Sequence, residues 1–225
     1  GDVAYGNFRI GSVAKVGGEY GLLLSDSETK IDNVSGMKVL DFDTDTKSSH
    51  WYRSGEVKEV GSINPDFLTS FSTSLRYKSL QLSVSLDARF GGYVASYGGR
   101  YGTGKGLTKS SLDYRDAAHG GANYKSRWDG KTYNDGVIPT GIFMAGTKID
   151  QPDGSYYTVG TGAYSSGETF EELMKKGVIE PAHASSWAFI NNTWINAASY
   201  PTQGVVTDAT LHKLNYIALR EISLS

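Results

Sequence analysis

The fold is decided by residues 67–90, which read FLTSFSTSLRYKSLQLSVSLDARF. Larger, mostly apolar residues alternate with small or polar ones along 67–77 and again along 80–90, and this period of two is typical of β-strands. The dipeptide Lys78-Ser79 separates the two alternating runs. The stretch therefore predicts an antiparallel β-hairpin with a very short turn.

The two faces of the second strand differ in polarity. One face carries Leu80, Leu82, Val84, Leu86, Ala88 and Phe90, and the other carries Gln81, Ser83, Ser85, Asp87 and Arg89. At about 3.3 Å per residue the strand is roughly 35 Å long, which is unusual for a soluble strand and suits a tilted membrane strand. Its polar face suits a water-filled lumen, whereas a soluble sandwich would turn the apolar face inward, and the pattern leaves both orientations open.

Outside the hairpin the strand signals are weaker. Short strands are expected over residues 8–16 and 20–24, and residues 26–54 are polar and rich in turn formers. Alternation returns over residues 214–224, where Arg220 interrupts it. Leu214, Tyr216, Ala218, Ile222 and Leu224 share one face, with Ile217 and Leu219 opposite. This indicates either a β-bulge or a strand that is buried on both faces. About four or five strands are too few to close a membrane barrel, which needs at least about eight.

Residues 91–205 form a long stretch that is rich in Gly, Tyr, Asn and Asp. Turns are expected at Asp129-Gly130, Asn134-Asp135-Gly136 and Asp153-Gly154. A connection of this length is either functional or a module of its own. One short helix is predicted near residues 169–176. Thr169 and Glu172 there fit a capping box, Lys175 and Lys176 suit the C-terminal dipole, and Gly177 suits the position after the helix.

Composition excludes several classes of protein. The 225 residues contain 22 Lys and Arg against 24 Asp and Glu, so nothing in the net charge of −2 favours nucleic acid as a partner. Cysteine is absent, which excludes disulfides and thiolate chemistry. Residues 1–11 show no signal-peptide pattern, and no apolar run is long enough for a membrane-spanning helix. The unusual counts are 28 Gly and 15 Tyr.

Several segments together resemble one family. In their order and spacing they are similar to the C-terminal barrel region of SusC/RagA-type TonB-dependent outer-membrane transporters of Bacteroidetes. These segments are residues 9–11, 17–21, 61–67, 75–78, 87–92, 129–136, 177–181 and 215–225. Nothing in the chain resembles the plug domain or the TonB box, so we interpret the chain as an internal or truncated segment of such a transporter.

The resemblance implies a mainly β fold. We expect antiparallel strands of a partial outer-membrane-type β-barrel at residues 1–90 and 206–225, and a long extracellular loop region with the short helix at residues 91–205. The implied function is uptake of glycans or peptides across the bacterial outer membrane with a SusD-like surface lipoprotein. Contact with TonB would come only through missing upstream regions, and the strands would face outer-membrane lipid.

Side chains of the long loop region are the candidates for ligand binding. Tyrosine and tryptophan offer rigid surfaces with an apolar face and a polar group, which suit sugars and peptides, and arginine pairs with carboxylates or hydrogen-bonds a glycan. The predicted ligand-binding residues are Tyr97, Arg100, Tyr101, Arg115, Tyr124, Trp128, Trp187 and Trp194.

Enzymatic and metal signatures are weak. The histidines, His50, His119, His183 and His212, lack zinc-site spacing and are expected on the surface or in loops. Asp41, Asp43 and Asp45 alternate as at the start of a calcium loop, but Thr46 and Tyr52 stand where an EF-hand has Gly and Glu, so calcium binding stays open. We expect no catalytic residues, no cofactor and no metal site. The alternative hypothesis is a free-standing soluble β-domain that binds glycans or protein partners and buries the apolar strand faces as its core.

Overall fold

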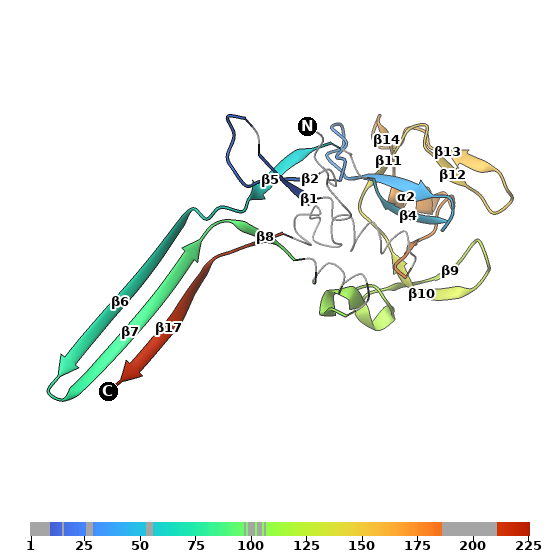
Figure 1. The fold of residues 1–225 in the computed structure, drawn as a ribbon. Helices are drawn as coiled ribbons and strands as arrows, with labels where there is room; N and C mark the ends of the chain where they lie inside the picture. Colours follow the sequence, from blue (N-terminus) through green and yellow to red (C-terminus); the bar gives the residue numbers. More distant parts are fainter. Residues whose placement is uncertain are drawn as a thin grey trace. The chain divides into compact units, whose positions relative to one another are not determined.

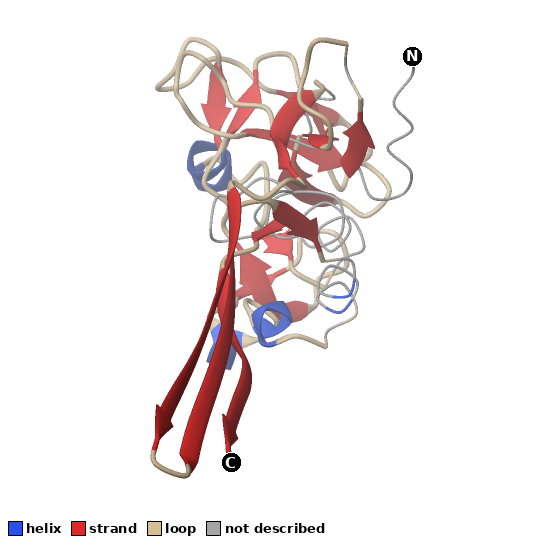
Figure 2. Ribbon diagram, turned by 60° about the vertical axis from the view of Figure 1, so that its left-hand side comes forward, coloured by secondary structure: helices blue, strands red, loops and turns tan. Residues whose placement is uncertain are grey.

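The computed structural model describes residues 10–14, 16–25, 29–52, 56–96, 107–185 and 211–225, with the single residues 98, 102 and 105. Most of its regular structure is β-strand (Figure 2). Nearly all of the strand pairs are antiparallel. The prediction of a mainly β chain with antiparallel sheets is therefore confirmed. The described sheets have between two and four strands each.

The chain divides into two compact units that interleave along the sequence. The first unit contains residues 1–25, 58–96 and 210–225, and the second contains residues 26–57 and 97–209. Residues 26–57 thus group with the long loop region, although they lie within the stretch 1–90 that was expected to be barrel-type. None of the described helices is long and apolar enough to cross a membrane.

The first unit contains a three-stranded ribbon in the order β17-β7-β6. β6 (Phe67–Tyr77) and β7 (Leu80–Phe90) pair without interruption from Phe67 opposite Phe90 to Tyr77 opposite Leu80, so the predicted hairpin is confirmed. β17 (Tyr216–Leu224) runs along the other edge of β7, and the chain ends beside the β6–β7 turn (Figure 1). Below, "the ribbon" means these three strands.

A β-bulge in β17 decides which of its side chains share a face. Leu219 lies opposite Leu86, but the next pair is Glu221 with Ser85, so Arg220 is the extra residue. Because of this shift, Ile222 returns to the face of Leu219. The sequence pattern placed Ile217 and Leu219 opposite Ile222 and Leu224, and the register corrects that assignment. The sequence left open either a β-bulge or a strand buried on both faces at residues 214–224, and the structure has the bulge.

Short sheets complete the first unit. Two short strands were expected over residues 8–16 and 20–24, and the structure has β1 (Ile10–Val13) and β2 (Leu22–Ser25) there, paired antiparallel. β5 (Lys58–Ser62) pairs with the other edge of β2. β8 (Tyr93–Ala95) pairs with β16 (Leu211–Lys213).

The second unit has its own hydrophobic core. It is built around the sheet β14-β11-β3-β4, made of β14 (Gly167–Thr169), β11 (Ile142–Met144), β3 (Val39–Asp43) and β4 (Ser48–Trp51). β11 and β3 pair in parallel, unlike the other pairs between the described strands. The buried core residues are Leu40, Phe42, Trp51, Phe143, Ile149, Val159, Phe170, Leu173 and Ile179. Residues 26–54, which are polar and turn-rich in sequence, thus supply two strands of this core sheet.

The rest of the second unit consists of short hairpins and helices. β9 (Ala122–Lys125), β10 (Thr132–Val137) and β15 (Ala182–His183) form one sheet, and β12 (Lys148–Asp150) pairs with β13 (Tyr156–Thr158). The 3₁₀ helices η2 (Lys109–Leu112) and η3 (Ala117–His119) precede β9. The expected turns at Asp129-Gly130 and Asp153-Gly154 are confirmed by the positive φ of their glycines, 73° and 85°.

The third expected turn, Asn134-Asp135-Gly136, was wrong. These residues lie inside β10, where the pairing with β9 shifts register between Tyr133 and Gly136. A bulge tolerates the glycine that the sequence pattern attributed to a turn.

The predicted short helix is confirmed as α2 (Phe170–Lys175). Thr169 is its N-cap, and the reciprocal hydrogen bonds between Thr169 and Glu172 form the expected capping box. Lys176 is the C-cap, and Gly177 follows with a φ of 67°. The helix buries Phe170 and Leu173 in the core of the second unit.

Candidate functional site

The ribbon of the first unit presents one apolar face. The strand register places its large apolar side chains side by side across all three strands. They are Phe67, Phe71, Leu75, Tyr77, Leu80, Leu82, Val84, Leu86, Phe90, Ile217, Leu219, Ile222 and Leu224. On the outer strands these side chains are exposed, with Leu75 at 63% and Ile222 at 65% of full accessibility. Apolar patches of this extent are typical of surfaces that meet a membrane or another protein.

The opposite face of the ribbon is lined by hydroxyl and charged groups. Ser72 and Ser85 are hydrogen-bonded at 3.0 Å, and Ser83 donates to Ser74 at 3.3 Å. The Arg220 guanidinium on the bulge donates to the Asp87 carboxylate at 2.8 Å. The ribbon therefore has two exposed faces of opposite character.

Three segments that carried the family resemblance meet at one end of the ribbon. Arg89 donates to the carbonyl oxygen of Ile63 at 2.9 Å, and Asn215 accepts a hydrogen bond from the Gly91 backbone at 2.8 Å. Gly92 has a φ of 77°, and a Cβ there would lie 2.8 Å from the Ile63 oxygen. Only glycine fits this close approach without strain. The residues 61–67, 87–92 and 215–225 thus form one structural junction.

In the second unit, Tyr124, Tyr133 and His183 form a row of rings that we call the aromatic platform. Tyr124 on β9 lies opposite Tyr133 on β10, and their ring centroids are 5.7 Å apart in a stacked arrangement. The Tyr133 and His183 rings are 4.7 Å apart and tilted by 59°. All three residues are partly exposed.

Gly136 makes room for this row. A Cβ at Gly136 would lie 2.9 Å from the Tyr124 ring, so the tyrosine packs directly over the backbone of β10. The glycine that misled the turn prediction therefore has a packing role.

The platform is held in place by a buried carboxylate. Asp135 is 4% exposed and bonds the His183 imidazole at Nδ1, and it also accepts the Ser185 backbone N–H at 3.0 Å. Burial by itself raises the pKa of Asp135, but the hydrogen bonds and charge of His183 and the Ser185 N–H outweigh it, so the net pKa is lowered. Asp135 stays ionised and orients the imidazole.

Of the predicted ligand-binding residues, Arg115, Tyr124 and Trp128 lie in the described part of the chain. Tyr124 belongs to the aromatic platform. Trp128 instead packs against the hydrophobic core, with the Lys47 ammonium over its ring at 5.1 Å. Arg115 donates to the Ser111 carbonyl oxygen at 3.0 Å. Outside the described residues are Tyr97, Arg100, Tyr101, Trp187 and Trp194.

Tyr133 and His183 were not among the predicted ligand-binding residues. A signal for Tyr133 exists, because Tyr124 and Tyr133 flank the Asp129-Gly130 turn at positions that face each other across a hairpin. His183 has no such signal, since it reaches Asp135 only through tertiary structure.

The alternating aspartates at 41, 43 and 45 serve the β3–β4 turn. The Asp43 carboxylate accepts the backbone N–H groups of Asp45 and Thr46 at 2.9 and 2.8 Å. Within the described residues no group of three or more His, Cys, Asp or Glu side chains gathers in a metal-binding arrangement.

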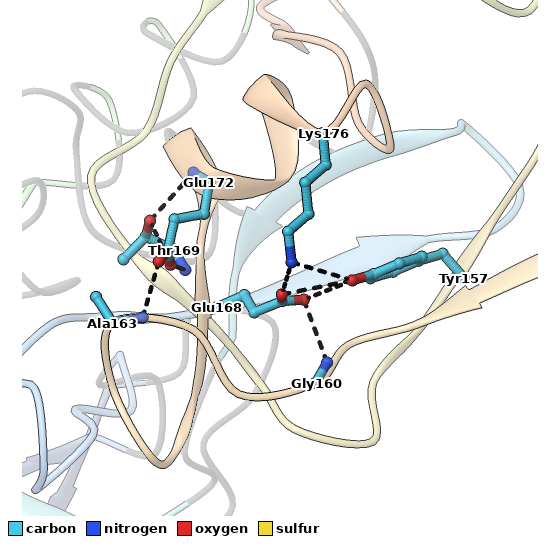
Figure 3. Close-up of polar contacts among 7 residues, drawn as sticks. All are labelled: Tyr157, Gly160, Ala163, Glu168, Thr169, Glu172 and Lys176. Atoms are coloured by element: carbon cyan, nitrogen blue, oxygen red, sulfur yellow. Dashed lines mark hydrogen bonds and ion pairs between the residues drawn. The ribbon is translucent and has the colours of Figure 1, made fainter.

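A second buried carboxylate, Glu168, supports the fold around α2. It accepts the Tyr157 hydroxyl at 3.0 Å and the Gly160 backbone N–H at 3.2 Å, and it pairs with the Lys176 ammonium (Figure 3). Its hydrogen bonds lead to groups of the same unit, so we assign Glu168 a structural role.

A comparison of the sequence with models of known protein families finds no match, and a comparison with curated proteins finds none either.

Proposed function

We propose that this chain is a non-enzymatic segment of a TonB-dependent outer-membrane transporter that takes up glycans or peptides with a SusD-like surface lipoprotein. The observation that carries the proposal is the ribbon, whose long strands expose an apolar face and a polar face at once. A strand of a membrane barrel has this alternation because one face meets lipid and the other lines the lumen.

The strand lengths support the same assignment. β6 and β7 have 11 residues each, and β17 has 9, which matches the roughly 9 to 11 residues that a tilted strand needs to span a bilayer. The outer edges of β6 and β17 pair with no other strand among the described residues. In a complete barrel both edges would pair with further strands.

The soluble alternative requires the apolar face to be a core. Burying one large apolar side chain stabilises a fold by about 1.5–3 kcal/mol. A domain that folds by itself in water would therefore bury the large apolar side chains of this face. In the described part of the chain Phe71, Leu75 and Ile222 remain more than half exposed. This exposure favours a lipid-facing role over a core role.

The second unit is proposed to stand on the extracellular side, because a long connection between two barrel strands belongs there and the opposite turns are short. Its compact core makes it a folded module rather than a loose loop. In this proposal it contributes to substrate capture and to contact with the lipoprotein.

Paired cysteine substitutions test the assignment of the two faces. The chain has no native cysteine, so a single thiol reports one position. The pairs are Leu75→Cys with Ser74→Cys, and Ile222→Cys with Ser223→Cys. Each variant carries a bimane label, and the chain is reconstituted in vesicles of lipids with brominated acyl chains. We expect strong quenching by the lipid at Leu75 and Ile222, and quenching by aqueous iodide at Ser74 and Ser223.

The neighbouring serine in each pair is the matched control, since it differs by one residue in depth and by the face it occupies. Equal lipid quenching at both members of a pair, or iodide quenching at Leu75 and Ile222, would contradict the transporter assignment.

A further inference from the structure

The polar face of the ribbon carries an open hollow near the structural junction. The hollow has a volume of about 350 Å³ and is lined by Leu68, Thr69, Ser70, Asp87, Ala88 and Tyr216. All of these residues belong to the first unit. Small-molecule sites in proteins have volumes of about 300–1,000 Å³, so the hollow is large enough for one small ligand or one unit of a polymer.

The strand register explains why the hollow forms there. A row of large side chains crosses the ribbon beside a row of smaller ones. The first row is Leu68, Arg89 and Tyr216, and the second is Ser70, Asp87 and Ala218. Residues two apart along a strand share a face, so both rows rise from the polar face. The difference in side-chain size leaves the hollow over the second row, with Leu68 and Tyr216 beside it.

Tyr216 supplies an aromatic surface to this hollow. It is 41% exposed, and among the described residues it has neither a hydrogen bond nor a contact with another ring. A tyrosine ring offers an apolar face for C–H groups, and its hydroxyl offers a hydrogen bond at the edge. The side chain can therefore hold a ligand that is apolar on one face and polar at its rim.

Asp87 and Arg220 supply hydrogen-bonding groups beside the ring. Nε of Arg220 donates to Oδ2 of Asp87 at 2.8 Å, and the two side chains are 55% and 42% exposed. An ion pair this exposed contributes little by itself. Within the described residues no other partner holds Oδ1 of Asp87 or the terminal nitrogens of Arg220. One acceptor and several donors are thus open to a ligand, and Ser70 adds a hydroxyl.

The charges around the hollow cancel. Arg89 and Arg220 are positive, Asp87 and Glu221 are negative, and all four lie in neighbouring rows of β7 and β17. Arg89 is already engaged, because it donates to the Ile63 carbonyl oxygen at 2.9 Å. Balanced surroundings give no attraction to a ligand of either charge. Mixed donors and acceptors suit a neutral ligand whose groups both donate and accept, as hydroxyls do.

We propose that this hollow is a binding subsite for one neutral sugar ring. The C–H face of the sugar packs on Tyr216, and its hydroxyl groups bond to Asp87, Arg220 and Ser70. The inference rests on the proposed function, in which the polar face of the ribbon lines the lumen, and it selects glycans over peptides as the substrate.

Saturation-transfer NMR of the full chain tests the inference in a detergent without a sugar headgroup. The neutral probes are maltotriose, mannotriose and galactotriose, and the charged probes are the peptides Gly-Lys-Gly and Gly-Glu-Gly. We expect at least one trisaccharide to receive saturation at its ring C–H protons and to bind at least about tenfold more tightly than either peptide, a difference of about 1.4 kcal/mol.

Variants locate the site. Tyr216→Ala should weaken binding of that trisaccharide about five- to tenfold, the scale of one lost aromatic contact. Asp87→Asn should also weaken it, and Ser70→Leu should abolish it by filling the hollow. Tyr77→Ala is the matched control, because it removes an exposed tyrosine from the apolar face of the same ribbon. Circular dichroism of each variant shows whether the fold is kept.

Absence of binding by all three trisaccharides, tighter binding of a charged peptide, or an equal loss in Tyr77→Ala would overturn the inference. The cysteine experiment reads contact with lipid and involves no sugar, so the two proposals can fail separately. Lipid contact without sugar binding would overturn only the subsite. Sugar binding at the hollow without lipid contact would overturn only the transporter assignment.

Discussion

Glu168 shows how the neighbours of a single buried carboxylate offset the cost of its burial. Its side chain is 2% exposed, whereas that of its partner Lys176 is 48% exposed. A carboxylate this deeply buried is stable only when hydrogen bonds and an opposite charge replace its hydration. Tyr157, Gly160 and Lys176 supply these contacts (Figure 3).

Glu168→Gln should lower the free energy of unfolding of the second unit by about 2–3 kcal/mol at pH 7, because it removes the charge that Lys176 and Tyr157 bind. Urea unfolding followed by tryptophan fluorescence measures the change. The control is Glu171→Gln on the same helix, whose pair with Lys175 is more than 70% exposed on both sides and should change stability by less than about 0.5 kcal/mol. Equal effects of the two substitutions would refute the structural role of Glu168.

The same carboxylate makes stability depend on pH. Burial alone raises the pKa of Glu168, but Lys176, Gly160 and Tyr157 outweigh it, and the net pKa is lowered. A lowered pKa means that the contribution is complete above the pKa of the unfolded chain, about 4.3, and is lost as the pH falls through the folded pKa. The difference in stability between the native chain and Glu168→Gln should therefore shrink below about pH 4, as urea unfolding across that range would show. A constant difference would contradict this account.

At the scale of elements, α2 shows how local chemistry starts and ends a helix. It has 6 residues, too few to be stable without its capping box and its buried face. Thr169 accepts the Glu172 backbone N–H at 3.2 Å, and Glu172 accepts the Thr169 N–H at 2.7 Å.

Thr169→Ala should cost about 1 kcal/mol, because it leaves the Glu172 N–H without its side-chain acceptor. Thr169→Ser keeps the hydroxyl and should restore most of the stability. Thermal unfolding of the two variants gives the comparison. A serine variant as unstable as the alanine variant would show that the methyl group, not the cap, matters.

The ribbon shows what one extra residue does to a strand. Side chains alternate between faces, so without Arg220 as a bulge the apolar residues on its two sides would point in opposite directions. The bulge places Leu219 and Ile222 on one face and turns Arg220 toward Asp87.

At the scale of the whole molecule, the exposed apolar face governs how the chain behaves in solution. Without lipid or detergent, these faces and the unpaired strand edges should associate. Light scattering should find assemblies in plain buffer and a smaller species in detergent. A monodisperse monomer in plain buffer, with a fixed near-ultraviolet dichroism signal, would instead favour the soluble β-domain.

The substitutions Val84→Arg and Ser85→Arg test which face of the ribbon contacts lipid. Val84 lies mid-strand on the apolar face, and Ser85 is its neighbour on the polar face. An arginine on the lipid face near the bilayer midplane costs about 2–4 kcal/mol, so in a full-length transporter that contains this segment only Val84→Arg should prevent assembly into vesicles. Flotation of the two variants with vesicles measures insertion, and equal insertion would refute the lipid-facing assignment.

The sequence alone was sufficient for features that depend on neighbours along the chain. The hairpin of residues 67–90, the capping box at Thr169 and the turns at Gly130 and Gly154 were all predicted correctly. Each depends on alternation, a side chain that reaches three residues along, or a glycine with positive φ, and these are local properties. Tyr124, one member of the candidate site, was chosen from its residue type within the long loop region, and its role in ligand binding stays a prediction.

Only the tertiary structure decided what depends on distant contacts. It made strands of the polar stretch 26–54 by burying Leu40 and Trp51 against residues 142–179, and it chose the bulge at Arg220 through pairing with β7. It also brought His183 to Asp135, which is 48 positions away, and so completed the aromatic platform. Burial, register and side-chain pairing arise between segments far apart in the chain, and no periodicity within one segment encodes them.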